Sequence, residues 1–192
     1  MLEVADGPKP WDTLSTRSVV DLPPWFSVVC DRVKLPSGRV IDDYYRIVAP
    51  DYAIVCAVRA DGRIIMERHY KQCRGKFLLT CPAGGVEVTE TPLQAARREL
   101  LEETGYHAQA WTAMGSFTVD GTRGICEAHL YLAEQMEQVS KPEVSDTEEF
   151  ALVFLDRDSI AKAILDGSIC LLPDIALLSM IFGPFPPASK QE

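Results

Sequence analysis

Three glutamates near the end of one predicted helix are the residues best suited to chemistry in this chain. Glu99, Glu102 and Glu103 are three and four positions apart, so their side chains project toward one side of the helix. Carboxylates at this spacing repel one another, and the negative end of the helix dipole adds to the cost. A bound divalent cation would remove both penalties, and oxygen ligands suit Mg²⁺ or Mn²⁺ better than Zn²⁺. The spacing therefore predicts a site for Mg²⁺ or Mn²⁺.

The residues around these glutamates favour a rigid site. Arg98 lies four positions before Glu102, where it can form an ion pair along the helix. The opposite side carries an apolar stripe that is spaced to pack on a sheet, made by Leu93, Ala96 and Leu100. The alternative, a surface helix with a solvated acidic face, explains the glutamates but not the spacing of the residues around them.

Both ends of this helix are marked. Thr91 can cap the N-terminus, Pro92 fits the first helical position, and Gln94 completes a capping box with Thr91. Gly105 is typical of a C-terminal stop. The loop at 82–85 that precedes the helix lacks bulky side chains, so a phosphate group can approach its backbone closely. A carbonyl turned inward from Ala83 would add a neutral metal ligand.

The segment from Gly84 to Tyr106 resembles the signature of the Nudix family. That signature is G-x5-E-x7-R-E-U-x-E-E-x-G-U, where U is a bulky apolar residue. The matching residues are Gly84, Glu90, Arg98, Glu99, Leu100, Glu102, Glu103, Gly105 and Tyr106. Tyr106 is a soft departure, aromatic where an aliphatic residue is usual. Seven fixed residue types make chance agreement negligible.

The resemblance implies a role for each box residue. Glu99 and Glu103 should be the principal metal ligands, with Glu102 a further ligand directly or through water. Arg98 should orient the glutamates, and Glu90 should brace the loop. Two or three Mg²⁺ ions would polarise the bridging phosphates and activate a water that attacks one phosphorus. The implied activity is metal-dependent hydrolysis of a phosphoanhydride bond.

A general base must come from outside the box, because metal engages the glutamates of the box. The acidic loop at 140–149 precedes a predicted strand and can close over substrate. In the family branch described next, a glutamate of the corresponding loop takes this role. The resemblance favours Glu148, followed by Asp146 and Glu143. A merely solvated loop is the alternative.

Weaker similarity extends over residues 25–182 and resembles the ADP-ribose pyrophosphatase and nucleoside-diphosphate-sugar branch. It includes an N-terminal β-hairpin extension, Pro-Ala-Gly before the box, a Glu-Glu acidic loop and Asp-Gly-Ser-Ile at 166–169. The branch implies a nucleotide substrate, first ADP-ribose or a related nucleotide sugar. It also implies a homodimer in which the N-terminal strands form the dimer surface and part of the base pocket.

Several positions depart from this branch. Many relatives have Gln-Tyr-Arg where this chain has His-Tyr-Lys at 69–71, and Glu-Leu-Pro-Ala-Gly where it has Thr-Cys-Pro-Ala-Gly at 80–84. A proline expected some sixteen residues past the box is absent, and Gly121 stands near there. Other substrates therefore stay open: NADH, a nucleoside triphosphate, coenzyme A or GDP-mannose. A nucleotide-sensing module without activity should have lost metal glutamates, and none is missing.

Other side chains are weaker candidates. The basic residues that could contact phosphate are Arg46, Arg68, Lys71, Arg74 and Arg123. The aromatic residues that could stack a nucleobase, or pack in a core or dimer, are Trp25, Phe26, Tyr44 and Tyr45. Neither His69 nor His107 has a compelling partner in the sequence, which favours a surface role for both.

The elements that position these residues predict an α/β fold. Strands are expected at 25–35, 40–48, 53–59, 63–67, 77–81, 114–119, 125–133 and 150–155, and further helices at 159–166 and 174–182. Asp61-Gly62 predicts a tight two-residue turn. Residues 1–24 are expected to wrap the surface. Together these elements predict an α/β/α sandwich with a mixed sheet, in three parts: an N-terminal extension at 1–50, a Nudix domain at 51–183 and a flexible tail at 184–192.

Bulk properties exclude other classes. A net charge of −9 over 192 residues disfavours nucleic acid as a partner, because phosphate binding needs clustered Lys and Arg. No apolar run approaches the ~18 residues of a membrane span. The N-terminus lacks the features of a secretion signal, which predicts a cytoplasmic protein whose six cysteines are reduced.

Overall fold

The computed structural model describes residues 7–143 and 149–185 of the chain. Clustering of its contacts divides the chain into two compact units. The first unit comprises Met1–Pro50 and Thr118–Cys126, and the second comprises Asp51–Phe117 and Glu127–Glu192.

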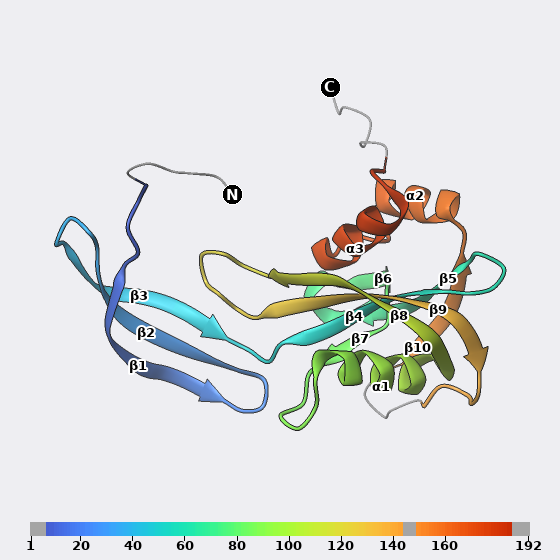
Figure 1. The fold of residues 1–192 in the computed structure, drawn as a ribbon, viewed down its shortest axis with the longest axis horizontal. Helices are drawn as coiled ribbons and strands as arrows, with labels where there is room; N and C mark the ends of the chain where they lie inside the picture. The colour runs from blue at the N-terminus through green and yellow to red at the C-terminus, as the bar shows by residue number, and fades with distance from the viewer. Residues whose placement is uncertain (1–6, 144–148, 186–192) are drawn as a thin grey trace. The chain divides into compact units, whose positions relative to one another are not determined.

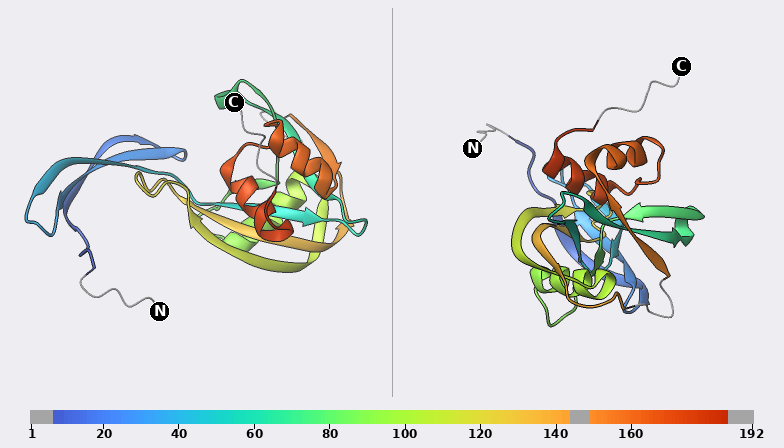
Figure 2. Two further views of the ribbon diagram at one scale, coloured as in Figure 1. Left: turned by 90° about the horizontal axis from the view of Figure 1, so that it is seen from above. Right: turned by 90° about the vertical axis from the view of Figure 1, so that its right-hand side faces the viewer.

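The first unit is a three-stranded antiparallel sheet, drawn in blue and cyan in Figures 1 and 2. Its strands, in order across the sheet, are β1 (Asp12–Leu22), β2 (Phe26–Lys34) and β3 (Val40–Val48). The segment 118–126 joins this unit through the backbone. Ile47 and Ala49 donate hydrogen bonds to the carbonyls of Arg123 and Ile125, at 3.2 and 2.9 Å.

Strand β1 forms at residues 12–22, within the segment 1–24 that was expected only to wrap the surface ahead of the first strand. The prolines at 8, 10, 23 and 24 flank this strand and do not interrupt it. The residues between them are largely Thr, Ser, Val and Leu, several of which favour strands. Thr16 also donates a side-chain hydrogen bond to Asp31 on β2, at 2.7 Å. The strand forms because β2, the next strand along the chain, pairs with it from end to end.

Large apolar side chains are exposed on the first unit. Every residue of β1 is exposed, and the side chain of Trp25 is 74% exposed. We call the following residues the exposed apolar set: Trp11, Leu14, Val19, Val20, Leu22, Trp25, Phe26, Tyr45 and Val48. Among the apolar residues of these three strands, Cys30 and Val33 are the buried ones, and neither belongs to the two core clusters of the second unit.

The second unit is built on a mixed sheet. The order of its main strands is β10 (Phe150–Leu155), β5 (Ile64–Lys71), β4 (Tyr52–Val58), β9 (Glu127–Gln138) and β8 (Tyr106–Thr118). Two short strands complete it: β6 (Lys76–Thr80) pairs with β5, and β7 (Ala83–Gly85) pairs with β4. Strand β4 is parallel to β9 and antiparallel to β5 and β7.

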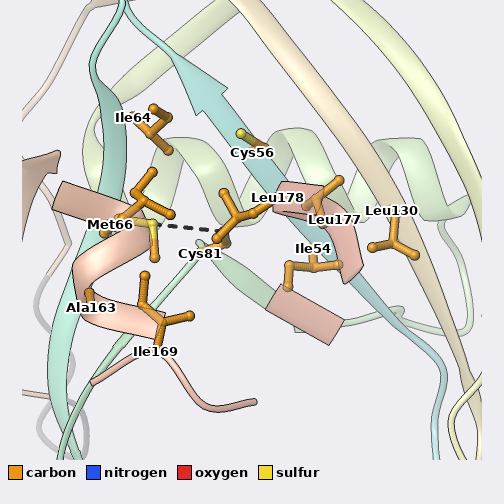
Figure 3. Packing of buried hydrophobic residues seen from close by; sticks show 11 residues of the cluster. Ile54, Cys56, Ile64, Met66, Cys81, Leu130, Ala163, Ile169, Leu177 and Leu178 are labelled. Atoms are coloured by element: carbon orange, nitrogen blue, oxygen red, sulfur yellow. Dashed lines mark hydrogen bonds between the residues drawn. The ribbon is translucent and has the colours of Figure 1, made fainter. Parts of the chain in front are cut away.

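Helices cover both faces of this sheet, which confirms the predicted α/β/α sandwich. Helix α1 (Pro92–Thr104) lies on one face, and α2 (Arg157–Leu165) and α3 (Leu172–Phe182) lie on the other (Figure 1). Alternate residues of β4 face the two sides: Ala53 and Val55 pack with α1, and Ile54 and Cys56 pack with α2 and α3. Figure 3 shows the second of these cores.

Strands β4 and β5 separate soon after they begin to pair. Their register is limited to two pairs, Ala57 with Ile65 and Val58 with Ile64. Beyond this point β4 pairs with β7 and β5 pairs with β6. The polar second half of β5 therefore lies beside the segment that leads into α1.

Several local expectations can now be compared with the structure. Strands β3 and β10 occupy the predicted residues, whereas β8 begins at Tyr106, eight residues earlier than expected. The predicted hairpin at Asp61-Gly62 is confirmed, because it joins the antiparallel strands β4 and β5. Its loop has three residues and not two, since the Arg59 backbone donates a hydrogen bond to the Arg63 carbonyl at 2.9 Å. All six cysteines are free thiols, as expected. No helix in the described part of the chain is long and apolar enough to cross a membrane.

Candidate active site

Helix α1 begins and ends where the sequence predicts. Thr91 Oγ1 accepts a hydrogen bond from the Gln94 backbone at 3.3 Å, and Gln94 Oε1 accepts one from the Thr91 backbone at 2.8 Å. Gly105 ends the helix with a positive φ of 73°, and a Cβ there would lie 2.3 Å from the Ser140 carbonyl oxygen. Leu100 on the opposite face is fully buried. The helix is therefore fixed at both ends and along its apolar face.

Arg98 links three of the box glutamates. Its guanidinium lies 2.6 Å from Glu90 Oε1, 2.7 Å from Glu99 Oε1 and 3.2 Å from Glu102 Oε2. It also donates to the Gly85 carbonyl at 3.0 Å, so the helix is bound to β7, the short strand that forms at 83–85 where a loop was expected. Hydrogen bonding with Glu90 raises the pKa of Arg98 and lowers the pKa of Glu90. These contacts are those that an orienting arginine and a bracing glutamate need.

Gly84 makes room for Glu99. A Cβ at position 84 would lie 1.9 Å from Glu99 Oε1 and 2.1 Å from its Cδ. The Glu99 carboxylate thus lies directly against the backbone of the loop. Any other residue at 84 would displace this carboxylate or the loop.

Glu103 contacts the same loop from the next turn of the helix. The Ala83 backbone donates a hydrogen bond to Glu103 Oε2 at 2.9 Å. Burial raises the pKa of Glu103 to about 10, and the charge of Glu67 and a hydrogen bond with it add to this effect. The metal-free site therefore favours the protonated form of the Glu103 carboxyl.

Glu67 is a site residue that the sequence reasoning missed. It lies on β5 after three fully buried apolar residues, and its side chain is 2% exposed. The sequence did contain a sign of this role. Glu67 ends the run Ile-Ile-Met-Glu, and a charged side chain that directly continues a buried apolar strand is unusual unless it has a partner.

The box residues supply the donors that a hard divalent cation requires. Glu99 and Glu103 flank the two residues Ala83 and Gly84, and all the side-chain donors there are carboxylate oxygens. In the described part of the chain, no three His, Cys, Asp or Glu side chains converge closely enough to enclose an ion. The physical reason is that Arg98 draws Glu99 and Glu102 toward Glu90. The donor chemistry fits Mg²⁺ or Mn²⁺, although the donors are not gathered around one point.

A pocket of about 220 Å³ lies in the second unit, where β4 and β5 separate. Glu103 and Ala83 form part of its wall, so it is continuous with the box. Its lining residues are Tyr52, Ile54, Glu67, His69, Lys71, Thr80, Cys81, Ala83, Glu103, Leu171, Pro173 and Asp174. This is the natural place for a group attached to the reacting phosphates.

The basic candidates are not gathered at this pocket. Among the described residues that line it, Lys71 is the only lysine or arginine. Arg68 lies over the ring of Phe77, 4.2 Å from its centroid. Two others belong to the first unit and have carboxylate partners there. Arg46 binds Asp31 at 2.5 Å, and Arg123 binds Asp120 at 3.1 Å.

Two further pocket residues differ from what the sequence suggested. His69 was expected at the surface, but it is half-buried in the pocket and 2.9 Å from Thr80 Oγ1. Burial, with a smaller effect of Lys71, lowers the pKa of His69 to about 4, so the ring is neutral at physiological pH. Asp174 was not singled out. It is buried, accepts a hydrogen bond from the Cys81 backbone at 2.6 Å, and burial raises its pKa to about 6. His107 is exposed, as expected.

The first two candidates for the general base, Glu148 and Asp146, lie outside the described residues. The flanks of their loop are described. The Glu143 backbone donates to the Glu102 carbonyl at 2.7 Å, and Phe150 pairs with His69. The loop therefore starts at the box helix and returns beside a pocket residue.

Comparisons with known proteins agree with this geometry. Residues 49–171 match the family model of the NUDIX domain, and residues 11–47 match that of the nucleoside diphosphate sugar hydrolase N-terminal domain. The second match covers almost all of β1, β2 and β3.

Individual relatives point the same way. An ADP-ribose pyrophosphatase of Bacillus subtilis (strain 168) is 31% identical over 121 residues, which are 63% of this chain and 65% of that protein. A methanol dehydrogenase activator of Bacillus methanolicus is 30% identical over 141 residues, 72% of this chain and 75% of that protein. The phosphatase NudJ of Escherichia coli (strain K12) is 42% identical over 60 residues, 31% of this chain and 38% of that protein.

A solved structure described as an ADP compounds hydrolase has the same fold. Its TM-score is 0.81 at 17% identity, over 93% of this chain and 95% of that one. The box, its geometry and these matches lead to one conclusion: the chain belongs to the Nudix family and is related to an ADP-ribose pyrophosphatase.

Proposed function

We propose that this enzyme hydrolyses a phosphoanhydride bond, in the presence of Mg²⁺ or Mn²⁺, in a nucleoside diphosphate linked to a second group. ADP-ribose or a related nucleotide sugar is the first candidate substrate. The observation that carries this proposal is the pair Glu99 and Glu103 held against residues 83–84, at the wall of a 220 Å³ pocket. The matched N-terminal domain and the Bacillus subtilis relative support the substrate class.

The metal ligands in this proposal are Glu99 and Glu103, with Glu102 directly or through water and the Ala83 carbonyl as a neutral donor. When bound, the ions would stabilise charge on the phosphate oxygens and lower the pKa of a water molecule. Arg98 and Glu90 hold the carboxylates and the loop in place. Glu103 must release its proton before it can bind a cation.

A base on the acidic loop would accept the proton of the attacking water. Glu148 is the first choice, with Asp146 and Glu143 next. The support is positional, because the described flanks of the loop contact the box helix and the pocket strand. Glutamates engaged with metal are poor bases, since their lone pairs are occupied.

The pocket favours a hydroxyl-rich group over a chain of phosphates. A triphosphate tail needs several cations, and Lys71 is the only one among the described lining residues. Asp174, His69 and Thr80 offer acceptors and donors suited to hydroxyl groups instead. A nucleotide sugar therefore ranks above a nucleoside triphosphate. NADH, coenzyme A and GDP-mannose are the alternative substrates. The alternative function is a module that binds a nucleotide without cleaving it.

We also propose that the enzyme is a homodimer in the cytoplasm. The exposed apolar set of the first unit would be covered by a second copy. Free thiols at all six cysteines support a reducing compartment.

A substrate panel tests the proposal. Each diphosphate that is capped at both ends is incubated with the enzyme and Mg²⁺, alkaline phosphatase is added, and free phosphate is measured. Such diphosphates resist the phosphatase until the enzyme cleaves them, so a signal requires hydrolysis of the anhydride. Compounds that the phosphatase attacks directly, such as nucleoside triphosphates, are instead followed by chromatography of the products without it. We expect turnover of ADP-ribose that is lost when the first incubation contains no divalent ion and that Glu103→Gln nearly abolishes. Absence of turnover for every compound would favour the sensor, and turnover of triphosphates alone would contradict the substrate class.

A further inference from the structure

Glu67 has no role in the Nudix box, yet its carboxylate is buried beside the box. Its side chain is 2% exposed and lies on β5 next to the fully buried Met66. Burial of a carboxylate is costly unless another group compensates for it. Its position therefore calls for a functional reason.

The carboxyl groups of Glu67 and Glu103 meet at the pocket wall. They share a hydrogen bond, and both line the pocket beside Ala83. Glu103 Oε2 also accepts a hydrogen bond from the Ala83 backbone N–H, at 2.9 Å. Glu67 thus reaches the same few atoms as the box glutamates, but from the sheet and not from the helix.

Strand register places Thr80 opposite Glu67. The two residues are paired directly across β5 and β6, so their side chains lie on the same face of the sheet. Both also line the pocket. A carboxylate at either position would therefore face the same wall of the pocket.

We propose that Glu67 is a further carboxylate of the metal centre, contributed by the sheet and acting on the cation together with Glu103. The inference rests on the proposed metal dependence. Two carboxyl groups buried side by side are a costly arrangement, and a divalent cation between them relieves it. The competing account is that Glu67 only positions Glu103 through their hydrogen bond. The two accounts differ in whether the charge of residue 67 matters.

The test measures Mn²⁺ affinity by electron paramagnetic resonance of the free ion, on the full chain without substrate. Glu67→Gln keeps a hydrogen-bonding group but removes the charge. We expect it to weaken Mn²⁺ binding by about 10–100-fold, as loss of a supporting carboxylate does in other metal sites. The matched control is Asp174→Asn, which removes another buried pocket carboxylate and should leave the affinity within about threefold of wild type, well short of that loss.

A second variant tests the register argument directly. The double variant Glu67→Thr with Thr80→Glu moves the carboxylate to the facing strand, and we expect it to regain most of the lost Mn²⁺ affinity. Circular dichroism and Tm without metal identify any variant that fails to fold, and the rise in Tm on adding Mn²⁺ provides a second readout.

The outcomes separate this inference from the proposed function. Wild-type Mn²⁺ affinity in Glu67→Gln overturns the metal role of Glu67 while leaving metal-dependent hydrolysis intact. A double variant as weak as Glu67→Gln likewise contradicts the exchange across the strands. Failure of the wild-type enzyme to bind Mn²⁺ or to need a divalent ion would overturn both proposals.

Discussion

The Glu103 carboxyl accepts a hydrogen bond from the Ala83 backbone at 2.9 Å, so a residue of the Nudix helix is fixed to the loop that precedes it. Gly84, the next residue of this segment, lies directly against the Glu99 carboxylate. The box helix and residues 83–84 are therefore held together by the two glutamates that are proposed to bind the cation.

The first prediction concerns pH. Burial and Glu67 raise the pKa of Glu103 from 4.5 to about 10, so the metal-free folded state binds a proton that the unfolded state releases. Stability of the metal-free protein should therefore fall as pH rises from 7 toward 10. Mg²⁺ should reduce this slope, because a cation replaces the proton. The measurement is Tm against pH, in EDTA and in Mg²⁺.

Between pH 7 and about 8 this slope is separate from the other shifted groups of the pocket. The pKa of Asp174 is about 6 and that of His69 about 4, and the buried Cys81 thiol, whose pKa burial raises from 9.0, contributes only at higher pH. Glu103→Gln is the control and should lose the slope between pH 7 and about 8 in EDTA. Identical slopes in wild type and in this variant would contradict the assignment.

The second prediction concerns Arg98. Lysine cannot reach Glu90, Glu99, Glu102 and the Gly85 carbonyl at once, as the guanidinium does. Because Arg98 is only 26% exposed, Arg98→Lys should lower the free energy of unfolding by about 1–3 kcal/mol. Urea denaturation measures the loss. Arg97→Lys, on the exposed side of the same helix, should change stability by less than ~0.5 kcal/mol. An equal decrease in the free energy of unfolding in the two variants would contradict a stabilising role for the contacts of Arg98.

Local interactions explain which parts could be predicted from the sequence. The ends of α1 depend on Thr91, Gln94 and Gly105, which lie within a few residues of the groups that they satisfy. The box residues follow from spacing on that one helix. Strand β1 was missed because its backbone hydrogen bonds are made with β2, so the pattern of residues 12–22 alone does not predict it.

The pocket was missed for a related reason. Glu67, His69 and Asp174 come from a strand and a distant helix, and they meet only because β4 and β5 separate. The basic candidates failed to converge because a count of arginines does not reveal that Arg46 and Arg123 already have acidic partners.

The third prediction concerns the general base. Glu148→Gln should lower kcat by roughly 10²–10⁴, the range for a lost acid–base group, while Mn²⁺ affinity stays unchanged. Stopped-time assays of product formation give kcat. The control is Glu137→Gln, at an exposed position of β9 with no assigned role, which should leave kcat unchanged. If Glu148→Gln keeps more than about a third of wild-type kcat, far above that range, the base lies elsewhere and Asp146 is tested next.

The fourth prediction concerns assembly. The proposed homodimer predicts that light scattering at micromolar concentration gives twice the 21.3 kDa mass of one chain, since the exposed apolar set is large enough to require cover. Val19→Lys, within β1, should shift the protein toward the monomer. Leu165→Lys changes an exposed apolar residue of the second unit and should have no effect on mass. A wild-type monomer at this concentration would contradict the dimer.

The most direct test of the central claim is phosphorus NMR of ADP-ribose incubated with the enzyme and Mg²⁺. Hydrolysis of the anhydride predicts loss of the two diphosphate resonances and growth of two phosphomonoester resonances, from AMP and ribose 5-phosphate. The reaction should stop in EDTA and slow on the order of 10³-fold in Glu103→Gln, as expected when an essential active-site group is removed. Diphosphate resonances that persist unchanged for ADP-ribose and for every nucleotide sugar, with folded protein and saturating Mg²⁺, would contradict the account.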